Sequence, residues 1–246
     1  MRKKKVYLSN TSIKTFMACK KRYKYKHIDR ISMGDSVSNK YMSFGNSIHI
    51  TMADFNMLTN SQHGTLDVLH NLLRKNWIRD GYESKEEERT FGLRGLDMLS
   101  LYYDNPLDIG SKNLLIEEMI FKEMEHYVLC GKLDKVYMRE DEVIEIIDYK
   151  TGKSISPIDQ IQLPVYLILA ESNLGIYPGA VSLYFLAQNE KVTQELDSRF
   201  IDTSTQFIYD LCDLISNEKD FSSSPNCNCK TNCEFYSICE DAKTTI

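Results

Sequence analysis

The sequence predicts an α/β fold, in which a central mixed β-sheet is flanked by helices. Three observations support this prediction. Runs rich in β-branched and aromatic residues recur between residues 114 and 188 and are separated by charged turns. A helical pattern lies between the third and the fourth run, and a crossover helix of this kind joins parallel strands. Residues before about 110 show mainly helical spacing, so helices are expected to precede most of the sheet.

The N-terminal half is expected to be mostly helical. Residues 6–9 look like a short extended lead-in, after which Asn10 or Thr11 would cap the first helix. Residues 32–40 are polar and predict a loop. The apolar spacing predicts helices over residues 12–28, from Ser43 onward, over 65–80 and over 86–104. The region from about 50 to 110 is therefore predicted to be a helical insertion.

The C-terminal half is expected to supply the sheet. Strand patterns cover residues 114–121, 126–138, 142–150 and 181–188. Between the third and fourth patterns, Ser156 is a good helix cap and Pro157 suits the first helical position, which predicts a helix over 156–173 despite Pro164. A last helix is expected over residues 203–219, before a cysteine-rich tail.

Composition indicates a globular protein with a single domain over residues 1–246. Of these residues 42% are hydrophobic and 26% charged. Because no run of about 18 apolar residues occurs, no membrane partner is expected. The start, MRKKKVYLSN, lacks the apolar stretch of a signal peptide, which favours a reducing, cytoplasmic location. The seven cysteines are then poor candidates for disulfides.

The charge is unevenly distributed along the chain. The net charge is −5, yet residues 1–30 hold eleven Lys and Arg residues and one acidic residue, Asp29. Such an asymmetry is typical of a basic face that contacts nucleic-acid phosphates, although a solubilising basic tail would have the same composition. The candidate contact residues are Lys21, Arg22, Lys24 and Lys26.

Two acids and a lysine fall on neighbouring predicted strands. Asp134 lies in GKLDKVY, and Asp148 and Lys150 lie in IIDYKTGK. Because strand side chains alternate, Asp148 and Lys150 point to one face, which Asp134 reaches if the hairpin register allows. Two adjacent carboxylates repel each other unless a divalent cation lies between them. A cross-strand acid beside a solvated lysine is the plainer interpretation of this spacing.

The motifs in their order resemble the RecB-like branch of the PD-(D/E)XK nuclease superfamily, whose core is restriction-endonuclease-like. GKLD is followed by IIDYKTGK and QLPVY, and FGNSIHITMADF lies upstream. Single elements are weak signals, but the ordered set is specific. The residues that match the family's motifs are Gly131, Asp134, Asp148, Lys150, Thr151, Gly152, Gln162, Tyr166 and, in the upstream element, His49.

The resemblance implies a role for each of these residues. The expected metal ligands are His49, Asp134, Asp148 and the backbone carbonyl of Tyr149, and the metal is Mg²⁺ or Mn²⁺. Asp134, Asp148, Lys150, Gln162 and Tyr166 form the expected catalytic set. Glu118 resembles a supporting acid of the family, and Glu117 competes for the same alignment. For His49, Gln162 and Tyr166, simple packing of a helix against the sheet is the competing interpretation.

The C-terminal tail holds four cysteines, Cys227, Cys229, Cys233 and Cys239, which suit a zinc site of their own. The tail and Cys19 also resemble nucleases of the AddB type and CRISPR-associated exonucleases, which implies a structural [4Fe–4S] cluster. Its expected ligands are Cys19, Cys229, Cys233 and Cys239, with Cys227 as the alternative to Cys229. The expected cluster segment is therefore residue 19 together with 227–239. Cys130 and Cys212 are expected to be small core residues.

The function expected from these features is metal-dependent hydrolysis of DNA. The resemblance implies an exonuclease that acts on single-stranded DNA or on DNA ends, with a helicase or a recombination, CRISPR or viral replication partner. The alternative is a non-catalytic nucleic-acid-binding or assembly subunit with a structural zinc or iron–sulfur site. A subunit that had lost catalysis would be expected to lack Asp134, Asp148 or Lys150, and all three are present.

Overall fold

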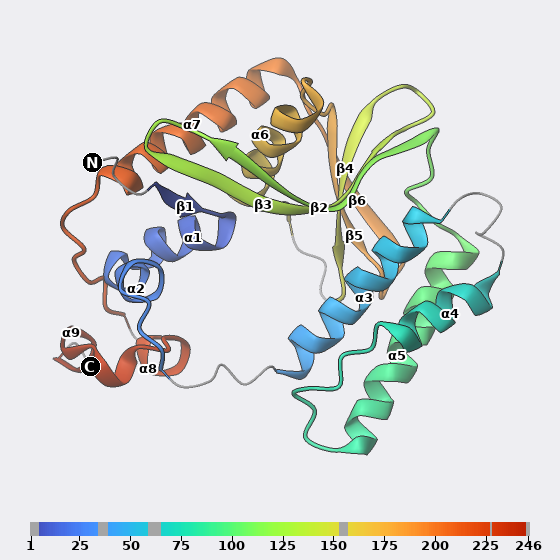
Figure 1. Ribbon diagram of the computed structural model, residues 1–246, viewed down its shortest axis with the longest axis horizontal. Coiled ribbons are helices and arrows are strands. Elements are labelled where there is room, and N and C mark those ends of the chain that lie inside the picture. The colour runs from blue at the N-terminus through green and yellow to red at the C-terminus, as the bar shows by residue number, and fades with distance from the viewer. Residues whose placement is uncertain (1–4, 34–38, 59–64, 153–156, 227, 245–246) are drawn as a thin grey trace.

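The computed structural model describes residues 5–33, 39–58, 65–152, 157–226 and 228–244 (Figure 1). Within these ranges a six-stranded mixed sheet separates two groups of helices, so the predicted fold class is confirmed. The strands are β1 (Val6–Leu8), β2 (Lys112–Glu123), β3 (Tyr127–Met138), β4 (Ile144–Lys150), β5 (Ala180–Phe185) and β6 (Glu190–Glu195). Among the described residues, no helix combines the length and apolar character needed to cross a membrane.

Strand β3 is the centre of the sheet. One edge pairs antiparallel with β2 along most of its length, and the other edge has two successive partners. The short β1 pairs in parallel with the first residues, Tyr127–Leu129, and β4 pairs antiparallel with the last, Lys135–Met138. Residues 130–134 of β3 therefore lack a strand partner on that edge within the described chain. The predicted catalytic acid Asp134 lies at the end of this gap.

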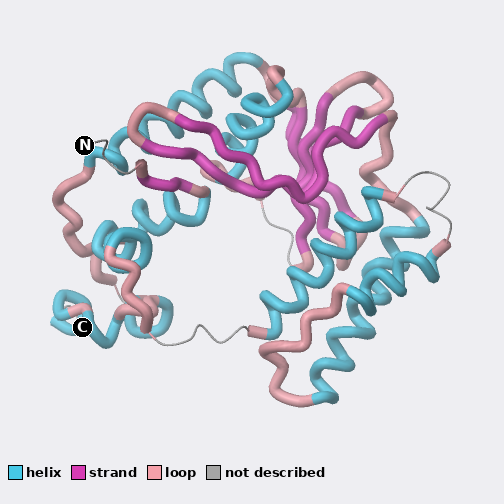
Figure 2. Tube along the Cα trace, in the orientation of Figure 1, coloured by secondary structure: helices cyan, strands magenta, loops and turns pink. Residues whose placement is uncertain are grey.

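Helices cover the two faces of the sheet separately (Figure 2). The longer helices are α1 (Asn10–Ala18), α3 (Lys40–Met57), α4 (Leu66–Lys75), α5 (Lys85–Asp104), α6 (Gln162–Leu174) and α7 (Ser198–Asn217). Apolar residues of α1, α6 and α7 share one core cluster with β2–β5. Residues of α3, α4 and α5 form a second cluster with β3–β5 on the other side. Strands β3 and β4, which carry Asp134, Asp148 and Lys150, thus contribute to both clusters.

The crossover helix α6 is apolar on all sides because the sheet, α1 and α7 surround it. Residues Leu163–Ala170 are all buried. The helix begins at Gln162, where the Asp159 carboxylate accepts the N–H groups of Ile161 and Gln162. The predicted cap, Ser156, lies outside the described residues, and the predicted helix start at Pro157 is wrong, because residues 157–161 form a non-helical approach to α6. Gly131 lets α6 approach β3, since a Cβ there would come within 2.8 Å of a Leu169 methyl group.

The first helix differs from the prediction. Ser9, and neither Asn10 nor Thr11, is its N-cap, through a capping box with Ser12. The predicted continuous helix over 12–28 is interrupted at Cys19, whose extended backbone ends α1. The chain continues as α2 (Lys20–Tyr23) and a π-helical turn over Lys24–Ile28. Cys19 still donates its N–H to the Thr15 carbonyl and accepts the N–H of Tyr23, and its side chain lines a cavity shared with the C-terminal tail. The elements of the tail are α8 (Cys229–Asn232), a short 3₁₀ turn (Tyr236–Ile238) and α9 (Glu240–Thr244).

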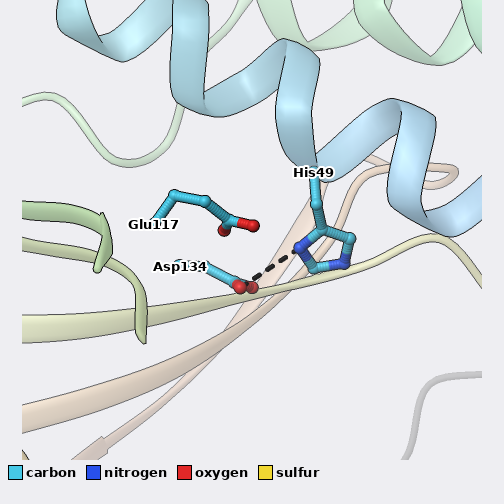
Figure 3. Close-up of side chains that lie close together, drawn as sticks. All are labelled: His49, Glu117 and Asp134. Atoms are coloured by element: carbon cyan, nitrogen blue, oxygen red, sulfur yellow. Dashed lines mark ion pairs between the residues drawn. The ribbon is translucent and has the colours of Figure 1, made fainter. Parts of the chain in front are cut away.

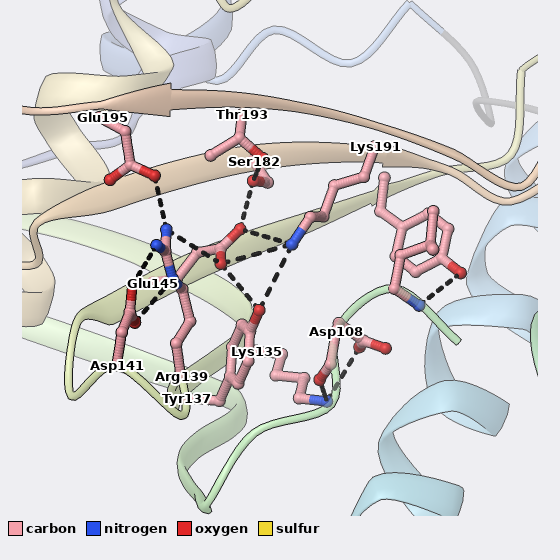
Figure 4. Close-up of polar contacts among 12 residues, drawn as sticks. Asp108, Lys135, Tyr137, Arg139, Asp141, Glu145, Ser182, Lys191, Thr193 and Glu195 are labelled. Atoms are coloured by element: carbon pink, nitrogen blue, oxygen red, sulfur yellow. Dashed lines mark hydrogen bonds and ion pairs between the residues drawn. The ribbon is translucent and has the colours of Figure 1, made fainter. Parts of the chain in front are cut away.

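A buried polar network connects the second core cluster to β3 and β4, and Figure 4 shows its Lys135–Asp108 pair. Lys135 Nζ, in β3, donates to Asp108 Oδ2 at 2.9 Å and to Asn56 Oδ1 at 2.9 Å. Tyr149, in β4, donates its hydroxyl to the same Asp108 oxygen and accepts a hydrogen bond from Asn56. Because α3, β3 and β4 all contribute, this network fixes the backbone that carries Asp134 and Asp148.

Replacing Lys135 by methionine is expected to lower the free energy of unfolding by about 3–5 kcal/mol, because Asp108 would be left as an unpaired charge with no exposed surface. The double variant Asp108→Leu, Lys135→Met should lose less. Lys75→Met is the matched control, since Lys75 pairs with Asp54 at the surface. Urea unfolding of the four proteins measures these values. Equal losses in Lys135→Met and Lys75→Met would refute this role.

Candidate active site

Asp134 occupies the point where β3 and β4 diverge. Beyond the pair of Lys135 with Ile147, the strand ladder stops. There Asp134 Oδ2 accepts the backbone N–H of Tyr149 at 2.8 Å in place of a strand partner. Asp134 Oδ1 lies 3.1 Å from Nδ1 of His49, which projects from α3 (Figure 3). One carboxylate thus connects β3, β4 and α3.

Glu117 of β2 completes a group of three. The ligand atoms of His49, Glu117 and Asp134 lie within 4.8 Å of one another (Figure 3). Oxygen and imidazole donors at this spacing suit Mg²⁺ or Mn²⁺. Lys132 forms an ion pair with Glu117 at the edge of the group. A surface cavity of about 400 Å³ is lined by these three side chains together with Lys132.

A local irregularity in the sheet directs both carboxylates to the same place. Glu117 has a positive φ of 50°, which is uncommon for a residue other than glycine and costs about 1–3 kcal/mol. It lies opposite Asp134, between the register pairs Ile116–Lys135 and Glu118–Leu133. Leu133 and Val136 belong to one core cluster, although strict alternation would place them on opposite faces. The regular pleat is therefore broken at the position of the two acids.

The family motif's remaining polar side chains gather on the α6 side of β4. Asp148 and Lys150 form an ion pair and point to the same face, as the alternation predicts. Gln162 Nε2 donates to Asp148 Oδ2 at 3.2 Å and to the Tyr166 hydroxyl at 2.7 Å. Gln162 and Tyr166 thus hold the orientation of Asp148 from the first turn of α6.

The electrostatics of Asp148 differ from those of an ordinary surface acid. Burial raises the pKa of Asp148 to about 6, and the charge of Asp134 adds to this, while Lys150 and His49 act in the opposite direction. Burial lowers the pKa of His49, but the hydrogen bond to Asp134 and the charges of Asp134, Glu117 and Asp148 outweigh burial and raise it. Burial also raises the pKa of Tyr166, which stays a neutral phenol.

The backbone of Tyr149 faces the same site. The Lys150 carbonyl accepts the N–H of Leu186, after the end of β5, so the preceding carbonyl, that of Tyr149, points to the opposite edge. This is the edge on which the Tyr149 N–H meets Asp134. The side chain of Tyr149 points into the core and bonds Asp108.

The structure does not bring every expected residue to the site. Glu118 is exposed and lies 3.5 Å from Asn173 of α6, while its neighbour Glu117 stands beside His49. Asp148 is outside the group of three in the described residues and is bonded to Lys150 and Gln162. The only sequence signal for Glu117 is that it aligns with the family's supporting acid as well as its neighbour Glu118 does.

The four basic residues expected to contact DNA are all paired with carboxylates. Lys21 pairs with Asp241 at 2.7 Å, and both Arg22 and Lys26 pair with Glu234. Lys24 pairs with Asp29. In the structure, three of these four charges join the N-terminal segment to the C-terminal tail, which lie side by side in Figure 1.

Four cysteines from opposite ends of the chain line one cavity of about 150 Å³: Cys19, Cys229, Cys233 and Cys239. Cys19 Sγ accepts the N–H of Arg22 at 3.5 Å, and Cys229 Sγ accepts the N–H of Asn226 at 3.3 Å. Cys227, the alternative to Cys229, lies outside the described residues. Cys212 is fully buried in the core beside α1 and α6, and Cys130 is half-buried in β3.

Comparisons with known proteins agree with this geometry. The family model described as the PD-(D/E)XK nuclease superfamily matches residues 7–240. A candidate exonuclease from Eubacterium rectale shares 13% sequence identity over 98% of this chain and 88% of its own, with a TM-score of 0.51. At this identity the likeness shows the fold alone.

Two further solved structures are more distant. The protein SSO0001 is 15% identical over 98% of this chain and 88% of its own, with a TM-score of 0.40. The protein VC1899 from Vibrio cholerae is 12% identical over 86% of this chain and 55% of its own, with a TM-score of 0.24. No curated protein matches the sequence. The family match covers nearly the whole chain, and this protein belongs to the PD-(D/E)XK nuclease superfamily.

Proposed function

We propose that the protein is a metal-dependent deoxyribonuclease of the RecB-like branch, acting as an exonuclease on single-stranded DNA or DNA ends. The observation that carries the proposal is the convergence of His49, Glu117 and Asp134 beside the Asp148–Lys150 pair. Two acids and an imidazole around one surface cavity, with an acid and a lysine on the neighbouring strand, are groups that phosphodiester hydrolysis uses. We also propose that residues 1–246 form a single nuclease domain, because both core clusters share one sheet.

The donor set fits a divalent cation. His49, Glu117 and Asp134 would hold the ion, with the Tyr149 carbonyl pointing to the same edge and Asp148 near enough to influence the pKa of His49. When bound, Mg²⁺ or Mn²⁺ would supply Lewis acidity toward the phosphate and lower the pKa of an attacking water. This assignment adds Glu117 to the ligands that the motif implies and leaves Glu118 outside.

The other side chains of the site have separate proposed roles. Lys150 Nζ, held by Asp148, would orient the attacking water and offset the negative charge that builds on the phosphate. Gln162 fixes the Asp148 carboxylate, and Tyr166 in turn holds Gln162. Cleavage would leave a 5′-phosphate and a 3′-hydroxyl, as in the superfamily.

We propose a [4Fe–4S] cluster held by Cys19, Cys229, Cys233 and Cys239. The support for this proposal is that four thiols line one shared cavity and that one of them, Cys19, comes from the opposite end of the chain.

The proposed role of the cluster is structural. It would join the N-terminal segment to the tail at the place where Lys20, Lys21 and Arg22 already pair with acids of the last 30 residues. Unbridged cysteines of this kind favour a reducing compartment such as the cytoplasm. Any unwinding of duplex DNA would come from a helicase or another recombination, CRISPR or replication partner.

Mn²⁺ affinity is expected to fall as the pH falls from about 8 to about 6. The raised pKa of His49 means that its imidazole binds a proton more tightly than a free histidine, and a bound proton excludes the metal. Titration calorimetry of His49→Asn should show weaker binding with a flatter pH dependence. His126→Asn, in the exposed β2–β3 hairpin, should behave as the unmodified protein. Identical pH profiles for His49→Asn and the unmodified protein would contradict the assignment.

Exonuclease action can be separated from internal cleavage with one pair of substrates. Linear and circular single-stranded DNA of the same sequence are incubated with the protein and Mn²⁺. Degradation of the linear strand with the circle left intact supports the proposal. Equal degradation of both would leave the nuclease assignment standing and refute the requirement for a free end.

A further inference from the structure

A second surface cavity, of about 490 Å³, opens beside the end of β4. Helix α3 contributes Tyr41 and Phe44, helix α5 contributes Phe91 and Arg94, and the chain after β4 contributes Thr151. Its volume lies within the range of pockets that bind small organic ligands. The cavity combines aromatic walls with a single cation, which is the chemistry that recognises a nucleotide.

Arg94 is held at the end of β4. Its Nη2 donates to the Thr151 carbonyl at 2.6 Å, one residue beyond Lys150, and its guanidinium lies 5.0 Å from the centre of the Phe44 ring. A guanidinium carries five N–H donors, so donors remain for an anion. Among the described residues no carboxylate pairs with Arg94, unlike Lys21 or Arg22. Its positive charge is therefore available to a phosphate.

The aromatic wall is partly exposed, and its rings contact one another. Tyr41, at the rim, is 65% exposed and packs edge-on against Phe91, with ring centres 5.9 Å apart. Phe91 packs edge-on against the buried Phe44 in turn. An exposed ring fixed by such contacts can stack on a nucleobase without regard to its identity.

Two structural elements, α3 and the end of β4, carry residues of both the cavity and the catalytic group. Helix α3 carries both Tyr41 and His49, which at 1.5 Å per residue are separated by about 12 Å along the axis. Between them, a Cβ at Gly45 would lie 3.6 Å from Thr151 Oγ1, so α3 and the end of β4 are in close contact there. A DNA strand whose scissile phosphate lies at His49 and Asp134 and that runs along α3 toward its N-terminus would pass this cavity.

We infer that this cavity is the subsite for a nucleotide next to the scissile phosphate. Arg94 binds the phosphate of that nucleotide, and Tyr41 stacks on its base. The planar guanidinium suits a phosphate because two parallel N–H groups can bind two oxygens. The inference rests on the proposed nuclease function and adds to it two specific contacts with the substrate strand.

The test combines Arg94→Ala with single-stranded oligonucleotides in which one phosphate at a time is a neutral methylphosphonate. For the unmodified protein, neutralising one linkage beside the cleaved one should lower kcat/KM about tenfold or more. For Arg94→Ala, the same linkage should matter little, because its partner is absent. The control Arg89→Ala, on the opposite face of α5, should retain the full sensitivity.

A purely structural role for Arg94 would give a different result. It would lower the cleavage of every oligonucleotide by the same factor. The inference would be overturned if Arg94→Ala and the unmodified protein were equally sensitive to the methylphosphonate at every linkage near the cleaved one. Mn²⁺ binding of Arg94→Ala, measured in parallel, should match that of the unmodified protein. Failure of the unmodified protein to cleave any DNA would instead refute the proposed function.

Oligonucleotides with one abasic site test the role of Tyr41 separately. Removing one base next to the cleaved linkage should raise KM about tenfold for the unmodified protein and for Tyr41→Phe. Tyr41→Ala should be insensitive to the same loss. Equal sensitivity of Tyr41→Ala and the unmodified protein at every position would exclude stacking on this ring.

Discussion

Replacing Asp148 by asparagine or Lys150 by alanine is expected to lower kcat for DNA cleavage by about 10³-fold or more. Asp148 is buried, has a pKa raised to about 6 by burial and by Asp134, and forms an ion pair with Lys150. Asparagine removes the charge that holds Lys150 in place. Alanine removes the cation that faces the phosphate.

The matched controls make the same type of substitution at exposed positions away from the proposed active site. Glu125→Gln lies in the exposed β2–β3 hairpin, and Lys112→Ala lies at the exposed start of β2. Both should cleave as the unmodified protein does. Binding of single-stranded DNA by the two active-site variants should stay within about threefold of normal, because phosphate contacts elsewhere remain. Retained cleavage by Asp148→Asn and Lys150→Ala together would place the active site elsewhere.

Replacing Cys19 or Cys233 by serine is expected to remove the proposed iron–sulfur cluster and to destabilise the fold. Each of the two residues comes from a different end of the chain and lines the same cavity. A cross-link that closes a loop of about 200 residues is worth roughly 5 kcal/mol on the chain-entropy scale. The unmodified protein, purified without oxygen, should be brown and contain iron. The variants should be colourless and unfold at a lower temperature.

Cys130→Ala is the control for the cysteine series. Cys130 is half-buried in β3 and is not among the residues that line the cysteine cavity, so iron content and colour should be unchanged. A colourless unmodified protein with one bound zinc would replace the iron–sulfur proposal by a zinc site. A Cys19→Ser variant that keeps full iron content would show that the N-terminal cysteine is not a ligand.

The predictable part of the fold follows from strong local patterns. The apolar run before Asp148 predicts β4, and the segment 156–173 predicts a crossover helix, which the structure has as α6 with a later start at Gln162. Alternation along β4 also predicts that Asp148 and Lys150 share a face. The polar edge strand β6, sequence EKVTQE, was missed because it has no apolar face to signal it.

The unpredictable part of the site depends on contacts between distant segments. The choice of Glu117 over Glu118 rests on one positive φ in the middle of a strand, which no spacing rule indicates. The pairing of Lys21, Arg22 and Lys26 depends on where the C-terminal tail folds back. Local charge density along the first helix therefore could not show that these cations already have carboxylate partners.

The measurement that tests the central claim most directly is cleavage of end-labelled DNA by the purified protein with Mn²⁺ or Mg²⁺ and with a chelator. A metal-dependent nuclease centred on His49, Glu117 and Asp134 should shorten the labelled strand only when the ion is present, and Asp134→Asn should stop it. Undegraded DNA in the presence of either ion, from protein that is folded and binds Mn²⁺, would contradict the nuclease assignment.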